Sequence, residues 1–209
     1  MKKPKSPYTA ITGCTFLYYE FKRILPLLMD AEAESLLKDE VESNRVLQVN
    51  SITSRKRFVT EFKHRYAAVP PLFWQSWQRM SESGQRIGLF YVMLKTYKLV
   101  FDFHLNVAMR KWNSVDHCLQ QDDLLMEFNE LSAHDDFVDS WSQATKKKCA
   151  STYLTILRQS GLLDERTNEL TPAKLDASEF AYYISSGEEW FLEACLLYPY
   201  EINDIKSQL

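Results

Sequence analysis

The sequence predicts a mainly α-helical protein built from small helical modules. The chain of 209 residues contains only 5 Gly and 7 Pro, too few for a loop-rich or disordered protein. Along most of its length, apolar residues recur at the three- and four-residue spacing of a helix. The order of these helices, with one polar turn near the end, indicates a helix-turn-helix-like N-terminal part and a winged-helix-like C-terminal part with a short β-hairpin.

Residues 1–70 are expected to form the helix-turn-helix-like module. Its first 13 residues, 1–13, are basic and look like a flexible arm. A helix is predicted over 15–29, where Pro26 should kink or restart it. Asp30 can then cap a second helix whose first turn is acidic.

The third helix of this module is amphipathic and begins with a basic run. Either Ser51 or Ser54 can cap it. Its apolar side consists of Phe58, Phe62, Tyr66 and Val69. Docking the first turn of such a helix into the major groove of DNA is the helix-turn-helix geometry.

Residues 71–115 are expected to be central, buried helices. A short aromatic helix precedes a long one that runs from about Glu82 to Asn113 and is apolar on most faces. A helix that is apolar nearly all round belongs inside a protein. At the other end of the chain, residues 176–209 are expected to form a cap of short helices.

Residues 116–175 are expected to form the winged-helix-like module. One helix, a short second helix near 133–139 and a third over 142–160 are predicted, and Gly161 suits the position after the third helix. The segment LLDERTNELTP at 162–172 then predicts two short strands around a polar turn.

The net charge of −3 hides an asymmetry between the two halves of the chain. Residues 1–115 carry 18 Lys and Arg against 10 Asp and Glu, a net charge of +8. Residues 116–209 carry 7 against 18, a net charge of −11. The split indicates a basic face for a polyanion and an acidic face for another partner or for solvation. The alternative is that the two halves neutralise one another.

This sequence lacks the signatures of several classes of protein. No apolar run approaches the ~20 residues that a membrane span needs, and the N-terminus does not resemble a signal peptide. The cysteines are far apart in sequence, which suits free thiols in a reducing cytoplasm; they are Cys14, Cys118, Cys149 and Cys195. No phosphate loop, nucleophile elbow or zinc-protease motif is present, so we expect no enzyme, no cofactor and no metal. The acidic pairs Asp122–Asp123 and Asp135–Asp136, with His134, leave a metal site open as a weaker alternative.

Nucleic acid binding has stronger support, because two predicted helices begin with cations. A helix N-terminus repels cations by roughly 0.3–1 kcal/mol each, and a phosphate partner would offset that cost. If Ser142 caps its helix, however, the lysines start the second turn, where the effect fades. Phosphate contacts give salt-dependent affinity, whereas Arg55 and Arg57 are the better candidates for base edges. The candidate DNA-binding residues are Ser54, Arg55, Lys56, Arg57, Lys63, Arg65, Thr145, Lys146, Lys147 and Lys148.

Two plainer interpretations compete with DNA binding. The cations could be ordinary solvated helix faces, since surface lysines are common. Trp74 and Trp77, with Phe73, could stack single-stranded bases, but their helical spacing beside a proline pair favours core packing.

Three segments resemble the BrxA family, small accessory proteins of bacteriophage exclusion (BREX) defence systems. They are TAITGCTFLYYEFKRIL, RIGLFYVMLKTYKLVFDFHLNVAMRKW and DFVDSWSQATKKKCASTYLTILRQSGLLDE, and the resemblance extends over most of residues 8–175. It implies a cytoplasmic, mostly helical, non-enzymatic protein that binds double-stranded DNA beside other BREX proteins. It carries no catalytic residues over to this chain, and it does not cover the last 35 residues.

The sequence therefore predicts a non-catalytic double-stranded DNA-binding accessory protein of phage defence. The alternative is a protein–protein adaptor whose acidic half, 116–209, docks another BREX protein while DNA binding is incidental. A hidden hydrolase is a third, weaker interpretation. The oligomeric state and the preferred DNA sequence do not follow from the residues.

Overall fold

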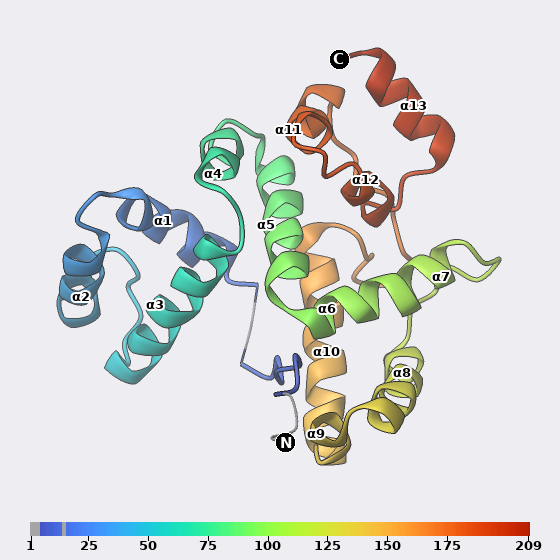
Figure 1. Ribbon diagram of the computed structural model, residues 1–209, viewed down its shortest axis with the longest axis horizontal. Coiled ribbons are helices and arrows are strands. Elements are labelled where there is room, and N and C mark those ends of the chain that lie inside the picture. Colours follow the sequence, from blue (N-terminus) through green and yellow to red (C-terminus); the bar gives the residue numbers. More distant parts are fainter. Residues whose placement is uncertain (1–4, 14–15) are drawn as a thin grey trace.

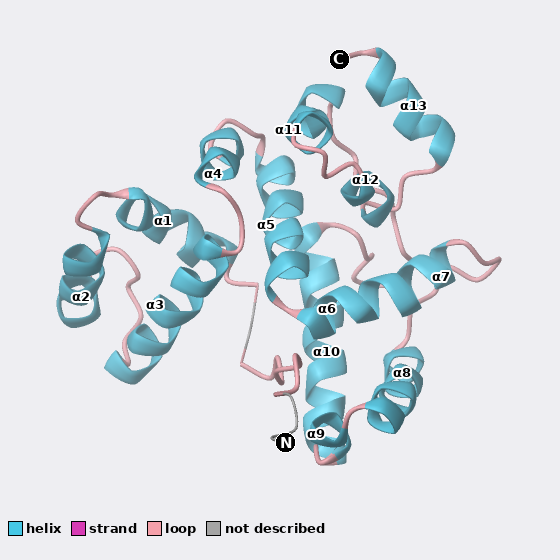
Figure 2. Cartoon of the chain, in the orientation of Figure 1, coloured by secondary structure: helices cyan, strands magenta, loops and turns pink. Residues whose placement is uncertain are grey.

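The computed structural model describes residues 5–13 and 16–209, and the fold is mainly helical (Figures 1 and 2). The α-helices are α1 (Tyr18–Met29), α2 (Ala33–Ser43), α3 (Ile52–Ala67), α4 (Pro71–Trp77), α5 (Glu82–Thr96), α6 (Lys98–Phe103), α7 (Met109–Trp112), α8 (Gln121–His134), α9 (Asp136–Asp139), α10 (Gln143–Ser160), α11 (Ala181–Ser185), α12 (Trp190–Ala194) and α13 (Pro199–Ser207). A π-helical turn η1 (His104–Ala108) and a 3-10 turn η2 (Ala177–Phe180) complete the regular elements of these residues. The predicted mainly α-helical class is confirmed. No helix in the described ranges is long and apolar enough to cross a lipid bilayer.

Helices α1, α2 and α3 form a three-helix unit at the left of Figure 1. Helix α1 continues through Pro26, so the predicted restart does not occur. The prediction that Asp30 caps α2 is also wrong, because α2 has Glu32 at its N-cap. The Asp30 carboxylate instead accepts the Glu32 backbone N–H at 2.8 Å and closes the turn between the two helices.

Residues 5–13, which we call the strap, are packed against the rest of the protein. The Tyr8 hydroxyl donates to Asp102 Oδ2 at 2.7 Å, and Ile11 is 1% exposed. The strap lies beside α10 in Figure 1. The prediction of a flexible arm is therefore wrong for these residues, because the arm carries apolar side chains that reach the core. Residues 1–4 lie outside the described ranges.

Helix α5 lies at the centre of the fold and contacts α3, α4 and α10 (Figure 1). The single long helix predicted over 82–113 is wrong. Tyr97 leaves the helical region, with φ −120° and ψ 107°, and the chain continues as α6, η1 and α7. The Tyr97 hydroxyl accepts a hydrogen bond from Arg65 Nε at 2.9 Å, so a contact to α3 holds the break in place.

Aromatic packing joins the N-terminal unit to the C-terminal cap. Trp74 and Phe73 are 0% exposed and Trp77 is 1% exposed, which confirms core packing and excludes a base-stacking platform. Phe73 meets Tyr182 of α11 with ring centroids 5.2 Å apart. A Cβ at Gly88 would lie 2.6 Å from Trp77 Cδ1, so the close approach of α4 and α5 requires glycine there.

Helices α8, α9 and α10 form a second three-helix unit, followed by the segment 161–175. The β-hairpin predicted at 162–172 does not form: only isolated antiparallel bridges occur in the described ranges, pairing Leu163 with Leu170 and Cys118 with Glu169. The Asp164 carboxylate accepts backbone N–H groups at 2.8 Å from each of the second and third residues after it. This turn occupies the residues that a longer ladder would need.

Two of the cysteines are buried free thiols, as expected. Cys149 and Cys195 are 0% exposed, and burial raises the pKa of Cys149 to about 11. Cys118 is free but only half-buried, and Cys14 lies outside the described ranges.

Candidate nucleic-acid interface

The start of α3 is organised by a serine cap. Ser51 is the N-cap, and its hydroxyl accepts the backbone N–H of Ser54 at 3.4 Å. Ser54 is therefore the third residue of the helix, and Arg55, Lys56 and Arg57 are the fourth to sixth. The cations thus follow the first turn instead of occupying it, which removes most of the unfavourable dipole interaction.

Arg55 is a buried structural residue and not an exposed DNA contact. Its side chain is 8% exposed, and its Nε donates to the carbonyl oxygen of Val41 at 2.6 Å. Its Nη1 donates to the carbonyl oxygens of Val49 at 2.7 Å and Asn50 at 3.1 Å. These bonds fix the connection that precedes α3 against the end of α2. Because it is buried and hydrogen-bonded within the protein, Arg55 is no longer a candidate DNA contact, which corrects the expectation that it reads base edges.

Arg65 and Lys63 are also occupied within the protein. Arg65 is 0% exposed and donates from Nη1 to the carbonyl oxygen of Phe16 at 2.9 Å. Lys63 Nζ forms an ion pair with Glu34 Oε1 of α2 at 2.5 Å. Burial excludes Arg65 as a DNA contact, and the charge of Lys63 is already partly neutralised.

Lys56 and Arg57 remain exposed at the start of α3. The Lys56 ammonium has no partner among the described residues. Among the described residues, Arg57 donates one hydrogen bond, from Nη2 to the carbonyl oxygen of Gly13 at 3.3 Å, and its guanidinium lies 5.9 Å from the centroid of the Phe58 ring, so most of its five N–H groups remain available. These two are the cations of the predicted α3 site that are exposed and form no ion pair with the described residues.

The start of α10 has the same construction. Ser142 is the N-cap, and its hydroxyl accepts the backbone N–H of Thr145 at 3.1 Å. Lys146 is 7% exposed and donates from Nζ to Ser132 Oγ of α8 at 2.8 Å. Lys147 and Lys148 are exposed and their ammonium groups have no partner in the described ranges. Lys146 is therefore no longer a candidate DNA contact, since its ammonium group points toward α8 of the same three-helix unit.

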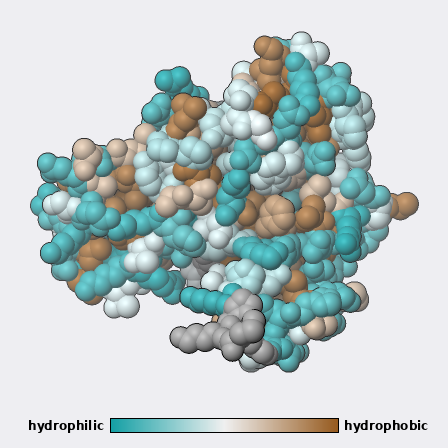
Figure 3. Space-filling view, viewed as in Figure 1, coloured by the Kyte–Doolittle hydropathy of each residue, from teal (hydrophilic) through white to brown (hydrophobic). Residues whose placement is uncertain are grey.

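The starts of α3 and α10 therefore carry residues of the same kind at the same positions. Each has a serine cap, a hydroxyl residue three positions later, then a buried cation and two exposed cations. We call Lys56 with Arg57 the α3 pair, and Lys147 with Lys148 the α10 pair. Both α3 and α10 begin at the lower side of the molecule in Figure 1, and the visible part of that edge in Figure 3 combines hydrophilic residues with some apolar ones.

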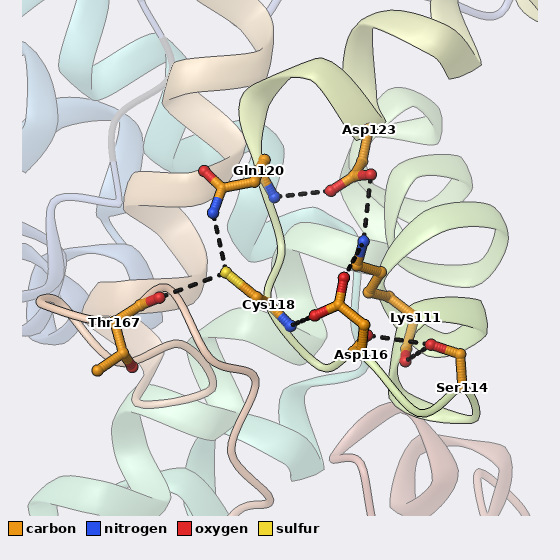
Figure 4. A network of polar contacts seen from close by, with 7 residues as sticks. All are labelled: Lys111, Ser114, Asp116, Cys118, Gln120, Asp123 and Thr167. Atoms are coloured by element: carbon orange, nitrogen blue, oxygen red, sulfur yellow. Dashed lines mark hydrogen bonds and ion pairs between the residues drawn. The ribbon is translucent and has the colours of Figure 1, made fainter.

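A polar network beside α8 is structural. Lys111 Nζ lies 2.9 Å from Asp116 Oδ2 and 3.4 Å from Asp123 Oδ1 (Figure 4). The hydrogen bond from Lys111 holds the pKa of Asp116 below its usual range. Asp123 also accepts the Gln120 backbone N–H at 2.7 Å, and the Gln120 amide donates to Cys118 Sγ at 2.8 Å. The network joins α7, the start of α8 and the turn at 164–168.

No metal site is assembled from the acidic pairs. Across the described residues, no three His, Cys, Asp or Glu side chains are placed to share an ion. Asp135 instead accepts the backbone N–H groups of Phe137 and Val138, each at 3.0 Å, and caps α9. These hydrogen bonds, chiefly the one from Val138, hold its pKa below the usual range.

Comparison with known sequences identifies the family. The sequence model of BrxA matches residues 7–187, most of the chain. The chain belongs to the BrxA family.

A BrxA relative and a solved structure show the same relationship. The "BREX protein BrxA" of Bacillus cereus (strain H3081.97) is 23% identical over 163 residues, which cover 78% of this chain and 82% of that protein. The crystal structure of an uncharacterized protein from Magnetospirillum magneticum superposes with a TM-score of 0.77 at 22% identity, covering 91% of this chain and 98% of the other. The BrxA-family chain therefore shares its fold with a protein solved by crystallography.

Sequence patterns missed one part of this interface, the strap. The lysines of residues 1–13 suggested a flexible arm, whereas the apolar side chains of the strap anchor it between the two helix starts. The available signal was the pair Tyr8 and Ile11 within an otherwise polar, basic segment.

Proposed function

We propose that this protein is a non-catalytic accessory factor of BREX phage defence that binds double-stranded DNA. One observation carries the proposal: two capped helices each present two exposed cations in the same register. Membership of the BrxA family and the name of the B. cereus relative support a place among BREX proteins, which would be its protein partners. Exposed lysine and arginine beside helix N-termini bind phosphate well.

Binding would be mainly electrostatic. Phosphate contacts carry no sequence information, and we expect the three lysines among the four accessible cations to make contacts of this kind. Arg57 is the one guanidinium among them, and beside its phosphate contact it is the best candidate to reach a guanine edge. We therefore expect modest sequence preference.

Titration of duplex DNA with the full chain tests this function. At about 50 mM salt we expect a saturable complex, and the logarithm of the binding constant should fall with the logarithm of salt with a slope of about −3.6 for four phosphate contacts. Absence of binding at that salt, or affinity that salt does not change, would contradict the proposal.

A second candidate function is that of a protein–protein adaptor. The exposed side of α8 combines the acids Asp122 and Glu130 with Met126, which is 67% exposed. An exposed apolar side chain between two acids on one helix face suits a partner surface that is basic and partly apolar.

Charge reversal on α8 tests the adaptor function. The double variant Asp122→Lys, Glu130→Lys should abolish co-precipitation with the other BREX proteins, while DNA binding persists. Asp123 and Glu127 are poorer choices, because Asp123 pairs with Lys111 and Glu127 accepts the Asn106 amide at 2.7 Å. Unchanged co-precipitation would rule out this surface.

A further inference from the structure

We infer that the α3 pair and the α10 pair hold one DNA duplex at the same time, with the strap setting their spacing. This inference rests on the proposed DNA-binding function and extends it. DNA binding alone requires only that either pair meets phosphate. Simultaneous binding requires that the pairs lie on one surface at a fixed separation that a single duplex can span.

The strap contacts the second turn of both helices. The carbonyl oxygen of Gly13 accepts from Arg57 of α3 at 3.3 Å. Two residues earlier, the strap lies beside α10 (Figure 1), where the backbone of Ile11 is close enough to the Cys149 thiol to oppose the rise in its pKa that burial causes; Cys149 directly follows the α10 pair. Ile11 is 1% exposed, so the strap is anchored between the helices and does not lie loosely over them.

These contacts bound the distance between the pairs. Ile11 and Gly13 are two residues apart, so their Cα atoms are separated by at most about 7 Å. Adding the reach of an arginine side chain and of the bonded groups at both ends places the backbones of Arg57 and Cys149 within about 30 Å of each other. One turn of B-DNA is about 34 Å long, so the backbone segments that carry the two pairs lie within about one turn of each other.

Charge limits the path of the duplex. Helix α9 directly precedes α10 and carries the exposed Asp139, with Asp135 at its cap. These carboxylates repel phosphate on that side of the α10 start. The strap lies on the way to α3, and its Lys5 is exposed. The favourable path therefore runs from the α10 pair across the strap to the α3 pair.

Rigid spacing also makes joint binding effective. Once one pair has bound, the second meets the same duplex at a high local concentration, because the strap and the core hold both helices in place. Two contacts alone would give a salt slope of about −1.8, and four would give about −3.6.

Sedimentation velocity with excess duplex tests the geometry. The full chain is mixed with a 12-bp duplex, about 41 Å long at 3.4 Å per base pair, at about 50 mM salt. We expect complexes with one duplex per protein chain. Two duplexes per chain would mean that the pairs act separately and would overturn the inference, while leaving DNA binding intact.

Salt slopes of matched variants provide the second measurement. Lys56→Gln with Arg57→Gln, and Lys147→Gln with Lys148→Gln, should each reduce the magnitude of the slope by about 1.8, and the quadruple variant by about 3.6. The control Arg79→Gln with Arg110→Gln removes the same charge from exposed residues after α4 and in α7, and should leave the slope unchanged.

The outcomes separate this inference from the function on which it rests. A slope that responds to one pair only would overturn joint binding. Failure of the unaltered chain to bind duplex would overturn the proposed function itself. Each double variant should keep a salt slope of about −1.8 from the pair that remains, which shows that the altered protein still binds DNA.

Discussion

Replacing Arg55 with methionine is expected to lower the free energy of unfolding by about 3 kcal/mol, while the folded protein keeps its salt-dependent DNA affinity. Methionine cannot donate to the three carbonyl oxygens that Arg55 satisfies, those of Val41, Val49 and Asn50. In a chain of this size the loss corresponds to a fall in melting temperature of about 6–12 °C. Urea denaturation with and without DNA measures both effects.

Lys56→Gln is the matched control for Arg55→Met, since the two residues are adjacent. Lys56 is exposed, so its variant should change stability by less than about 0.5 kcal/mol and reduce the magnitude of the salt slope by about 0.9. The opposite pattern, with Arg55→Met stable but deficient in DNA binding, would restore Arg55 as a DNA contact and contradict its structural role.

The environment of Arg55 explains why the effect should be large. The connection before α3 is held from two sides. The Glu40 carboxylate, 2% exposed, accepts the backbone N–H groups of Arg45, Val46 and Leu47 at 2.8–3.1 Å. Arg55 binds the carbonyl oxygens around the same connection. Loss of either side chain leaves buried backbone groups unpaired, at about 1–3 kcal/mol each.

Acidification from pH 7 to pH 5 is expected to lower the free energy of unfolding by about 2 kcal/mol through His104 alone. His104 is 2% exposed, and burial lowers its pKa to about 4, with the Ala194 carbonyl acting in the opposite direction. Its Nε2 donates to that carbonyl oxygen at 2.7 Å, so Nδ1 accepts from the Tyr153 hydroxyl at 2.9 Å. This arrangement requires the neutral ring.

The sign of the effect follows from the two pKa values. The unfolded chain protonates His104 near pH 6.5, whereas the folded protein resists protonation until about pH 4. Between these values the unfolded state binds more protons, so acid favours unfolding. The stabilisation is complete above pH 6.5 and is lost as the pH falls toward 4.

Denaturant titrations at several pH values test this expectation. His104→Gln should be less stable at neutral pH, and its stability should change less between pH 7 and 5. The carboxylates with lowered pKa, among them Asp116 and Asp164, affect stability mainly at lower pH. The change in stability between pH 7 and pH 5 therefore comes largely from histidine. Parallel pH profiles for the two proteins would contradict the assignment.

Local sequence rules predicted the helices well. Apolar spacing predicted the helical class and the positions of α3, α5 and α10, because a helix is specified by residues within a few turns of one another. Ser51 was one of two caps proposed for α3, and Ser142 was proposed for α10; the structure assigns both. With both caps assigned, the cations fall in the second turn, which removes the apparent conflict with the helix dipole.

Predictions that depended on distant partners failed. Arg65 looked exposed because it lies in a basic run, yet residues far along the chain, Phe16 and Tyr97, enclose it. The strap looked disordered because its anchors, among them Asp102, are remote in sequence. No glycine or proline occurs at the break after α5, so no local pattern in the sequence predicts it.

The sequence by itself determined that this chain is helical and that two of its helices begin with a serine cap and three cations. Only the tertiary structure decided which cations remain accessible, burying Arg55 and Lys146 and exposing the residues beside them. The reason is geometric. Successive residues on a helix point about 100° apart, so the placement of α2 and α8, set by the whole core, determines which of three adjacent charges faces solvent.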